Sequence, residues 1–196
     1  MLSTSRAVLG AVVALTIAAG SAPAQDRTGG HQHRGFWIGF GLGGGINASE
    51  GLDGEKLGGG AGYLRLGGTP SQKVLLGFEG LGWGRDQDGV GIARGNGSFV
   101  VMFYPSTQGG AFLKGGIGSA TSSRATTSGN STTTTSESGF GVTGGLGWDV
   151  RLGNNIYLTP NIDAVFQWFD AQTDPVLGDI PGNNTILTFT LGLTWH

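Results

Sequence analysis

The sequence predicts an all-β protein, an eight-stranded antiparallel up-and-down transmembrane β-barrel, from three observations. The closing stretch, 185–196, alternates apolar residues with small or hydroxylic ones over its whole length. Seven further stretches of strand length repeat this period of two, which places successive side chains on opposite faces of a sheet. Long and short polar connections alternate between the stretches, as in an antiparallel barrel that spans a membrane.

The closing stretch shows the pattern most clearly. It is about as long as a transmembrane β-strand, which needs roughly 9–11 residues. We expect it to pair with the first stretch, 35–45, so that neither edge of the sheet stays open. Its apolar face, which we expect to meet lipid, is formed by Leu187, Phe189, Leu191, Leu193 and Trp195.

The first four expected strands are 35–45, 58–67, 73–84 and 95–104. In each, aliphatic or aromatic residues alternate with glycines or polar residues, although 73–84 is apolar on both faces over part of its length. Their outward apolar residues are Phe36, Ile38, Phe40, Leu42, Leu64, Leu66, Val74, Leu76, Phe78, Phe99, Val101 and Phe103.

The remaining strands are expected at 110–118, 139–151 and 156–169, followed by the closing stretch. Their alternation is regular, and the turn 153–155 is marked by a Gly-Asn-Asn sequence. Their outward apolar residues are Ala111, Leu113, Ile117, Phe140, Val142, Leu146, Trp148, Val150, Ile156, Leu158, Ile162, Ala164, Phe166 and Trp168.

The connections divide into two sets. Four are polar and are expected to be long loops at one end of the barrel: 46–57, 85–94, 119–138 and 170–183. The segment 119–138 is nearly all Ser, Thr, Gly and Asn, which predicts a flexible loop because such a composition builds no core. Short turns are expected at the other end, together with both chain termini, since the number of strands is even.

Aromatic residues gather near the two ends of the expected strands, which predicts girdles at the two membrane interfaces. The girdle at the end with short turns would contain Phe36, Trp37, Phe103, Tyr104, Phe112, Trp148, Tyr157 and Trp195. The other would contain Trp83, Phe140, Phe166, Trp168 and Phe169.

The N-terminus predicts export. Residues 1–24 have a positive start, an apolar core and an Ala-Pro-Ala sequence, which together indicate a signal peptide cleaved after Ala24, with Ala22 as the other small residue of the cleavage site. The polar segment 25–34 is expected to be a flexible leader, and 35–196 to be the barrel domain.

Composition excludes several classes of function. The chain has 196 residues, a net charge of −2 and no cysteine. This length suits one domain. The charge gives no basic face for nucleic acid, and the absence of cysteine excludes a disulfide framework and thiolate metal sites.

The inward face carries charges of both signs. Because an unpaired charge inside the barrel costs several kcal/mol, we expect Glu79 and Asp163 to pair with Arg65 and Lys114 across the lumen. An eight-stranded barrel encloses a lumen that side chains fill, so we expect a plugged core rather than a pore. The expected polar network of the lumen is Arg65, Glu79, Lys114, Asp149, Arg151, Asn161, Asp163 and Gln167.

Catalytic and metal chemistry have little support in the sequence. The chain has only His31, His33 and His196, in the leader and at the terminus, so a Ser-His-acid site in the outer loops has no base. His31 and His33 lack a third ligand and are interpreted as part of a polar linker. We therefore expect no enzyme activity, no metal site and no cofactor.

The predicted signal peptide, the eight amphipathic stretches and a C-terminal strand with an aromatic near its end resemble the small bacterial outer-membrane β-barrels of the OmpA-transmembrane and OmpX type. The resemblance covers 35–196 and is one of pattern, without a catalytic motif. It implies a location in the outer membrane with both termini in the periplasm, in contact with outer-membrane lipid and lipopolysaccharide.

In that family the last strand is recognised by the barrel-assembly machinery. The resemblance assigns this role to Phe189, Leu191, Leu193 and Trp195. Deleting Trp195 and His196 together is expected to abolish membrane assembly, and deleting His196 alone to do little. A structural or surface-interaction role is implied, with an extracellular partner bound through the loops 46–57, 85–94, 119–138 and 170–183.

Two alternatives fit the same alternation. A soluble secreted barrel of the lipocalin kind, which binds a small apolar ligand, also has eight antiparallel strands, and Gly35-Phe36-Trp37 matches the short Gly-x-Trp pattern near the start of such proteins. In that case the apolar face lines the cavity. A lipid-modifying barrel enzyme is the other alternative.

Overall fold

The computed structural model describes residues 33–49, 56–87, 89–129, 131–170, 172–174, 178–180 and 182–196. The expected signal peptide 1–24, with Ala22 and Ala24, and the leader up to residue 32 lie outside the described residues. The strands are β1 (Gly35–Ser49), β2 (Lys56–Ser71), β3 (Val74–Gln87), β4 (Val90–Phe103), β5 (Ala111–Ser128), β6 (Ser131–Trp148), β7 (Val150–Arg151), β8 (Ile156–Trp168), β9 (Gln172–Asp174), β10 (Gly178–Ile180) and β11 (Asn183–Trp195).

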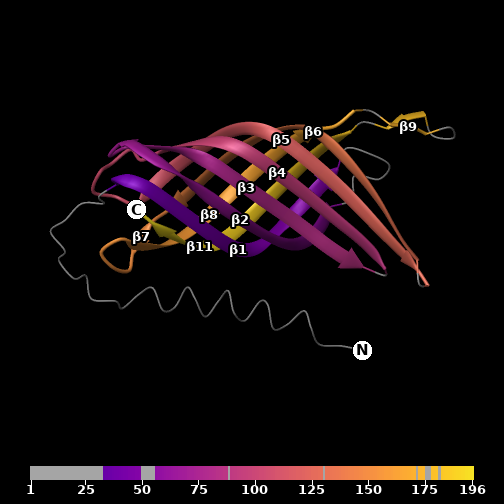
Figure 1. Ribbon diagram of the computed structural model, residues 1–196, viewed down its shortest axis with the longest axis horizontal. Helices are drawn as coiled ribbons and strands as arrows, with labels where there is room; N and C mark the ends of the chain where they lie inside the picture. The colour runs from indigo at the N-terminus through magenta and orange to yellow at the C-terminus, as the bar shows by residue number, and fades with distance from the viewer. Residues whose placement is uncertain are drawn as a thin grey trace.

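These strands close into an antiparallel up-and-down barrel, which confirms the predicted fold (Figure 1). Each of the eight long strands pairs with its neighbours in the chain, and β7 continues β6 after a break at Asp149. The strands β9 and β10 form a separate small hairpin. Among the described residues there is no helix long and apolar enough to cross a membrane.

The seam of the barrel joins its first and last strands. β11 pairs with β1 from Ile38–Trp195 to Ser49–Asn184, and its other edge pairs with β8. The sheet is therefore continuous around the barrel, which a strand structure in lipid requires because every backbone N–H and C=O must be paired.

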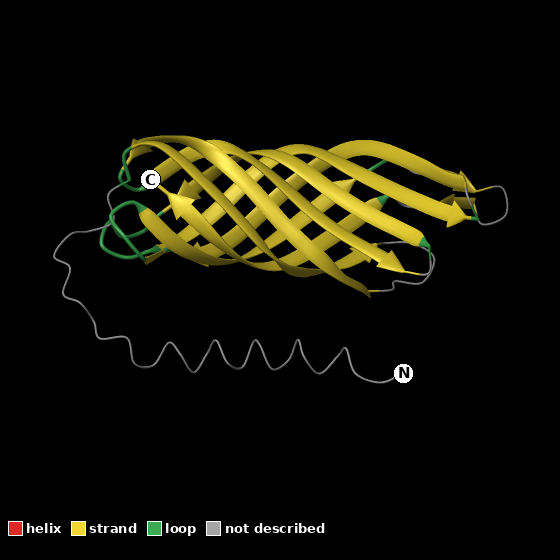
Figure 2. Cartoon of the chain, turned by 60° about the horizontal axis from the view of Figure 1, so that its bottom comes forward, coloured by secondary structure: helices red, strands yellow, loops and turns green. Residues whose placement is uncertain are grey.

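The two ends of the barrel differ (Figure 2). At the terminal end, as we name it, β1 begins, β11 ends, and the connections 72–73, 104–110 and 152–155 turn the chain. At the opposite end, the hairpin end, β5 and β6 extend beyond the neighbouring strands (Figure 1).

The prediction of long loops at 85–94 and 119–138 is wrong. Residues 85–87 and 90–94 belong to β3 and β4, and residues 119–128 and 131–138 belong to β5 and β6. Each pair of strands closes in a tight turn that contains a glycine with positive φ, 78° at Gly89 and 60° at Gly129. A hairpin turn needs only about two residues, so most of a polar segment can belong to the strands on either side of it. Glycine adopts the positive φ of such a turn without strain.

The Ser/Thr-rich segment forms strands without a core because its backbone pairs across the hairpin. The register runs unbroken from Ser119–Phe140 to Ser128–Ser131. Threonine favours strands, and cross-strand hydroxyl pairs add contacts, such as the 3.0 Å between the Oγ atoms of Ser123 and Ser136. The expected loops 46–57 and 170–183 are shorter than predicted for the same reason, since β1 reaches Ser49, β2 begins at Lys56, and 170–183 contains β9 and β10.

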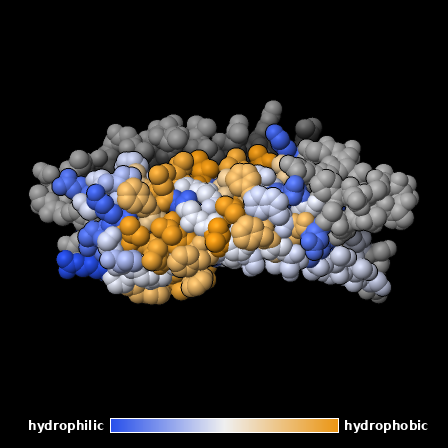
Figure 3. Space-filling view, turned by 90° about the horizontal axis from the view of Figure 1, so that it is seen from above, coloured by the Kyte–Doolittle hydropathy of each residue, from blue (hydrophilic) through white to orange (hydrophobic). Residues whose placement is uncertain are grey.

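The two faces of the barrel follow the predicted alternation. Phe78 is 65% exposed, whereas Glu79, the next residue of β3, is 3% exposed. Along β11, Leu187, Phe189 and Leu191 are exposed and the intervening residues are buried. Exposed apolar side chains come from every long strand of the barrel, and on the face shown in Figure 3 they form an apolar belt between more hydrophilic ends. A lipocalin-like barrel needs the reverse, an apolar lumen and a polar exterior.

The prediction of the aromatic girdles is wrong for five of their members. Trp37 and Trp83 are almost completely buried, and their indole N–H groups donate to the carbonyls of Gly68 and Gly45. A tryptophan satisfied in this way is stable inside the barrel. Position along a strand does not decide the face, whereas odd or even spacing does. The five girdle members that face inward are Trp37, Trp83, Tyr104, Phe112 and Tyr157.

Candidate functional site: the packed lumen and the histidine cluster

Four charged side chains meet in the middle of the lumen. Arg65 of β2, Glu79 of β3, Lys114 of β5 and Asp163 of β8 are each at most 5% exposed. The two positive and two negative charges cancel. The structure therefore brings together the four residues that the sequence analysis expected to pair.

The contacts within this cluster are short. Lys114 Nζ lies 2.6 Å from Glu79 Oε1 and 2.8 Å from Asp163 Oδ1. Arg65 Nε lies 3.1 Å from Glu79 Oε2, and Arg65 Nη2 is 3.9 Å from Asp163 Oδ2. Each charge has a partner of opposite sign, as buried charges require.

Asn161, also expected in the network, links the charged cluster to β11. Its Oδ1 accepts a hydrogen bond from Arg65 Nη2 at 3.0 Å. Its Nδ2 donates to Asp163 Oδ2 at 2.8 Å and lies 2.9 Å from Thr190 Oγ1. The amide thus uses both of its polar atoms to hold the two sides of the barrel together.

The ring of Tyr63 fills the lumen beside the charges. The guanidinium carbon of Arg65 lies 3.7 Å from the ring centroid, a cation–π contact. The ring lies against Gly41 and Gly192, which are register partners on β1 and β11. A Cβ at either glycine would overlap the tyrosine ring or its hydroxyl, so glycine at these positions gives the ring its space.

Apolar clusters lie on both sides of the charged layer. The cluster at the terminal end consists of Trp37, Leu75, Met102, Tyr104 and Phe112. The cluster at the hairpin end consists of Ala61, Leu81, Trp83, Val165 and Ile186. The inward side chains therefore form an apolar, an ionic and a second apolar layer along the barrel.

The other residues expected in the polar network lie elsewhere. Gln167 is buried closer to the hairpin end, where its Nε2 donates to the carbonyl of Gly95 at 2.7 Å. Asp149 is buried at the terminal end. Arg151 is only partly buried, and its Nε donates to the carbonyl of Gly153 at 2.9 Å. The strand β7 ends at this residue, and the side chain contacts the turn that follows.

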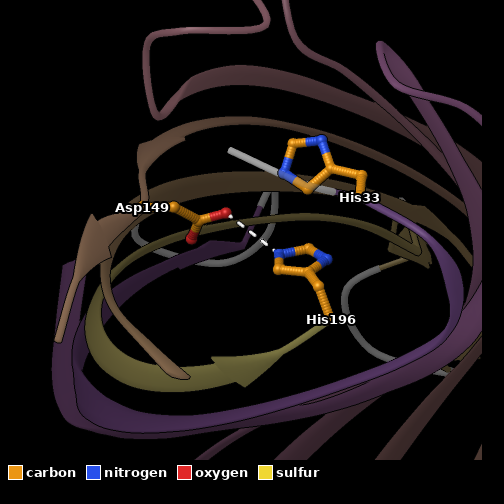
Figure 4. Close-up of side chains that lie close together, drawn as sticks. All are labelled: His33, Asp149 and His196. Carbon is orange, nitrogen blue, oxygen red and sulfur yellow. Dashed lines mark ion pairs between the residues drawn. The ribbon is translucent and has the colours of Figure 1, made fainter. Parts of the chain in front are cut away.

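A second polar cluster, the histidine cluster, lies at the terminal end and consists of His33, Asp149 and His196 (Figure 4). One potential ligand atom from each residue lies within 4.8 Å of the other two. His196 Nε2 is 3.5 Å from Asp149 Oδ2. The expectation that 25–34 is wholly a flexible leader is therefore wrong at His33, which is 1% exposed.

Asp149 is the best-anchored member of this cluster. Tyr104 donates its hydroxyl to Oδ2 at 2.7 Å, and Thr159 donates to Oδ1 at 2.6 Å. The residue lies in the break between β6 and β7, outside the membrane-spanning strands. Burial alone would raise the pKa of Asp149, but the adjacent His196 and the hydroxyls of Thr159 and Tyr104 outweigh it and lower that pKa below its usual value.

His33 is held by a hydrogen-bonded pairing with Gln72, in the turn between β2 and β3. The backbone N–H of His33 donates to Gln72 Oε1 at 3.1 Å, and Gln72 Nε2 donates to the carbonyl of His33 at 3.0 Å. The imidazole Nδ1 lies 2.9 Å from the carbonyl oxygen of Gln72. The ring packs against Tyr104, with centroids 4.2 Å apart.

The histidine cluster is not visible in the sequence because its members are far apart in the chain. His33 precedes β1, Asp149 interrupts the strand pair β6–β7, and His196 follows β11. The up-and-down topology returns all three positions to one end of the barrel. Two features of the sequence could have indicated the cluster. An even number of strands brings both ends of the chain to the same end of the barrel, and the alternation along 139–151 places Asp149 on the inward face.

Structural comparison identifies the fold. Ail, the attachment invasion locus protein of Yersinia pestis, superposes with a TM-score of 0.60 at 11% identity, over 84% of this chain and 99% of Ail. The chain has the fold of the small outer-membrane β-barrels. Neisserial surface protein A (NspA) superposes with a TM-score of 0.57, also at 11% identity, over 84% of this chain and 99% of NspA. No family model and no curated protein sequence matches the chain.

Proposed function

We propose that the chain is a non-enzymatic outer-membrane β-barrel protein with a side-chain-filled lumen and a structural or surface-interaction role. The observation that carries the proposal is the combination of an apolar outer belt with a buried, charge-balanced lumen. In lipid, only a closed sheet satisfies the backbone, and the apolar side chains have a favourable environment only outside the barrel. The same surface would make a soluble barrel aggregate.

The packing of the lumen supports a structural role over conduction. Arg65, Tyr63 and Lys114 extend into the lumen and are held by direct contacts with the walls. An aqueous path would have to cross both apolar layers and break this network. Eight strands also enclose too little space for an open channel beside such side chains.

The positions of the histidines argue against hydrolase chemistry at the hairpin end. The two histidines in the described part of the chain, His33 and His196, both lie at the terminal end. A general base near neutral pH is most often a histidine. A lipid-modifying site built on the hairpin end would need another base.

We further propose that the terminal end faces the periplasm and the hairpin end faces the exterior. A secreted N-terminus and a periplasmic assembly machinery that recognises Phe189, Leu191, Leu193 and Trp195 both favour this orientation. Outer-membrane lipid and lipopolysaccharide would surround the belt, and an extracellular partner would bind the hairpins formed around 46–57, 85–94, 119–138 and 170–183.

Fractionation with gel mobility tests the proposal. We expect the protein in detergent-extracted outer membranes, in a band whose mobility changes on heating, and no steady conductance when the purified barrel is added to planar lipid bilayers. Recovery of a soluble periplasmic protein would favour the lipocalin alternative. Stable conductance steps would contradict a filled lumen while leaving the membrane location intact.

A further inference from the structure

We propose that His33, Asp149 and His196 form a binding site for a divalent transition-metal ion, for which Zn²⁺ is the reference case. The site would lie inside the terminal end of the barrel and would join the segment before β1 to the last residue of the chain (Figure 4). Two imidazoles and one carboxylate are a donor set that zinc and the neighbouring first-row metals accept, with the fourth position left to water.

The distances suit such a site. Zinc binds imidazole nitrogen and carboxylate oxygen at about 2.0–2.2 Å, so two ligands in a tetrahedral site lie roughly 3.4 Å apart. His196 Nε2 and Asp149 Oδ2 are already 3.5 Å apart. The ligand atoms of the three residues all lie within 4.8 Å of one another, so a bound ion would draw them together by little more than 1 Å.

The hydrogen bond of His33 prepares its ring to bind a metal. A backbone carbonyl can only accept a hydrogen bond, so the contact of Nδ1 with the carbonyl of Gln72 places the ring proton on Nδ1 in the neutral imidazole. The lone pair is then on Nε2. Histidines that bind metals commonly donate their other N–H in this way, which fixes the tautomer and the ring orientation.

Asp149 is oriented by a similar outer shell. Tyr104 and Thr159 each donate a hydroxyl to one of its carboxylate oxygens. Thr159 is in turn 2.8 Å from Thr194 Oγ1, on the strand that carries His196. The carboxylate is therefore held in place beside the two imidazoles by groups from three different segments of the barrel.

His196 supplies the independent observation that a ligand is needed. Its side chain is 0% exposed, neither ring nitrogen makes a hydrogen bond among the described residues, and the one contact of Nε2 is the 3.5 Å ion pair with Asp149 Oδ2. Leaving such a buried polar group unsatisfied is costly. A metal ion bound at Nε2 would satisfy the nitrogen that faces Asp149.

The groups around the cluster favour a cation over other small ligands. The rings of Tyr104 and Tyr157 pack against the cluster, with the Tyr157 and His196 centroids 5.1 Å apart. The carboxylate of Asp149 is an anionic donor at the centre of the cluster, which disfavours a bound anion. A cation that binds imidazole and carboxylate suits these donors.

Titration of the purified, untagged chain in detergent tests the proposal. Zn²⁺ would be added to the apo-protein in a calorimeter, and Co²⁺ binding would be followed by visible absorption. We expect one ion per chain. His33→Gln, Asp149→Asn and His196→Gln should each lower the affinity by about 10-fold or more, because loss of a group that merely orients a metal ligand already costs about that much. Zn²⁺ should displace Co²⁺ from the same site.

The matched control is His31→Gln, since His31 is the third histidine of the chain and lies outside the described residues. Its affinity should equal that of the unmodified chain. Binding that is lost in His31→Gln and retained in His196→Gln would assign the ion to the leader and overturn the proposal, as would no saturable binding at all.

Folding of each variant would be verified by the heat-dependent shift in gel mobility. If Asp149→Asn fails to fold, His33→Gln and His196→Gln decide the outcome, because these two residues lie outside the strands. Equal affinity in both folded histidine variants and the unmodified chain overturns the proposal.

Discussion

Lys114 Nζ lies 2.8 Å from Asp163 Oδ1 although a whole strand, β6, separates the strands that carry them. Gly145 of β6 is the register partner of both residues. It has no side chain, so the ammonium and the carboxylate meet over its Cα. A Cβ at this position would overlap Asp163 Oδ1. The ion pair therefore depends on the glycine between its two partners.

Gly145→Ala should lower the free energy of unfolding by about 1–3 kcal/mol, the usual cost of overfilling a packed interior. Urea unfolding in detergent micelles would measure it. Gly144→Ala is the matched control, because nothing lies within 4 Å of a Cβ at this position. We expect its effect to stay within about 0.5 kcal/mol. Equal losses in the two variants would show that the strand, and not the ion pair, requires glycine.

Lys114→Met should cost about 3–5 kcal/mol, because it leaves two carboxylates with one guanidinium in a buried layer. Adding Asp163→Asn restores charge balance, since Arg65 and Glu79 still pair at 3.1 Å. The double variant should therefore recover at least half of the lost stability in the same urea titration. A double variant as unstable as the sum of the two single changes would mean that the charges act independently.

The alternation of residues predicted the fold and the charged layer because both depend on which face of the sheet a residue occupies, and odd and even positions along a strand face opposite sides. Once Glu79 and Asp163 are assigned to the inward face of a narrow barrel, they must find Arg65 and Lys114. Trp37 and Trp83 show the limit of reasoning from position along a strand. Their indole N–H groups find backbone acceptors inside the lumen, and this depends on three-dimensional contacts.

The Ser/Thr-rich segment and the histidine cluster could not be predicted for two different reasons. Amino-acid composition indicates whether a segment can bury its side chains. The hairpin around Gly129 buries few of them and is instead held by backbone pairing between β5 and β6. The cluster depends on which positions the barrel brings to one end, and His33 and His196 belong to no alternating pattern.

The hairpin structure changes where a protease should cut intact cells. A flexible loop would be cleaved anywhere within 119–138, but paired strands resist proteolysis. We expect proteinase K to cut near residues 129–130, between β5 and β6, and to leave 119–126 protected. Mass spectrometry of the released fragments would locate the cut. Cleavage spread evenly over the segment would contradict the paired hairpin, and cleavage only after cell lysis would reverse the proposed orientation.

The length of this hairpin should have little effect on the barrel itself. Replacing 124–135 by a two-residue Asn-Gly turn retains the pairing of Ser123 with Ser136 and every buried layer of the lumen. We expect unchanged gel mobility on heating and an unfolding midpoint close to that of the full chain. Failure to assemble would show that the extension contributes to folding, which its exposed side chains do not suggest.

The last two residues should have separable roles. Trp195 pairs with Ile38 at the seam and its ring stacks on Phe40, so deleting Trp195 and His196 together should abolish membrane assembly. Deleting His196 alone removes no strand pair, so assembly should persist, as the sequence predicts.

The structure adds a second consequence: the shortened chain should lose its stabilisation by zinc. Zn²⁺ at a hundred times its dissociation constant should stabilise the intact barrel by about 2.7 kcal/mol. Thermal unfolding with zinc and with a chelator would measure this difference in both chains. An equal zinc effect in the two would place the ion elsewhere, and absence of the shortened chain from the membrane would make His196 part of the assembly signal.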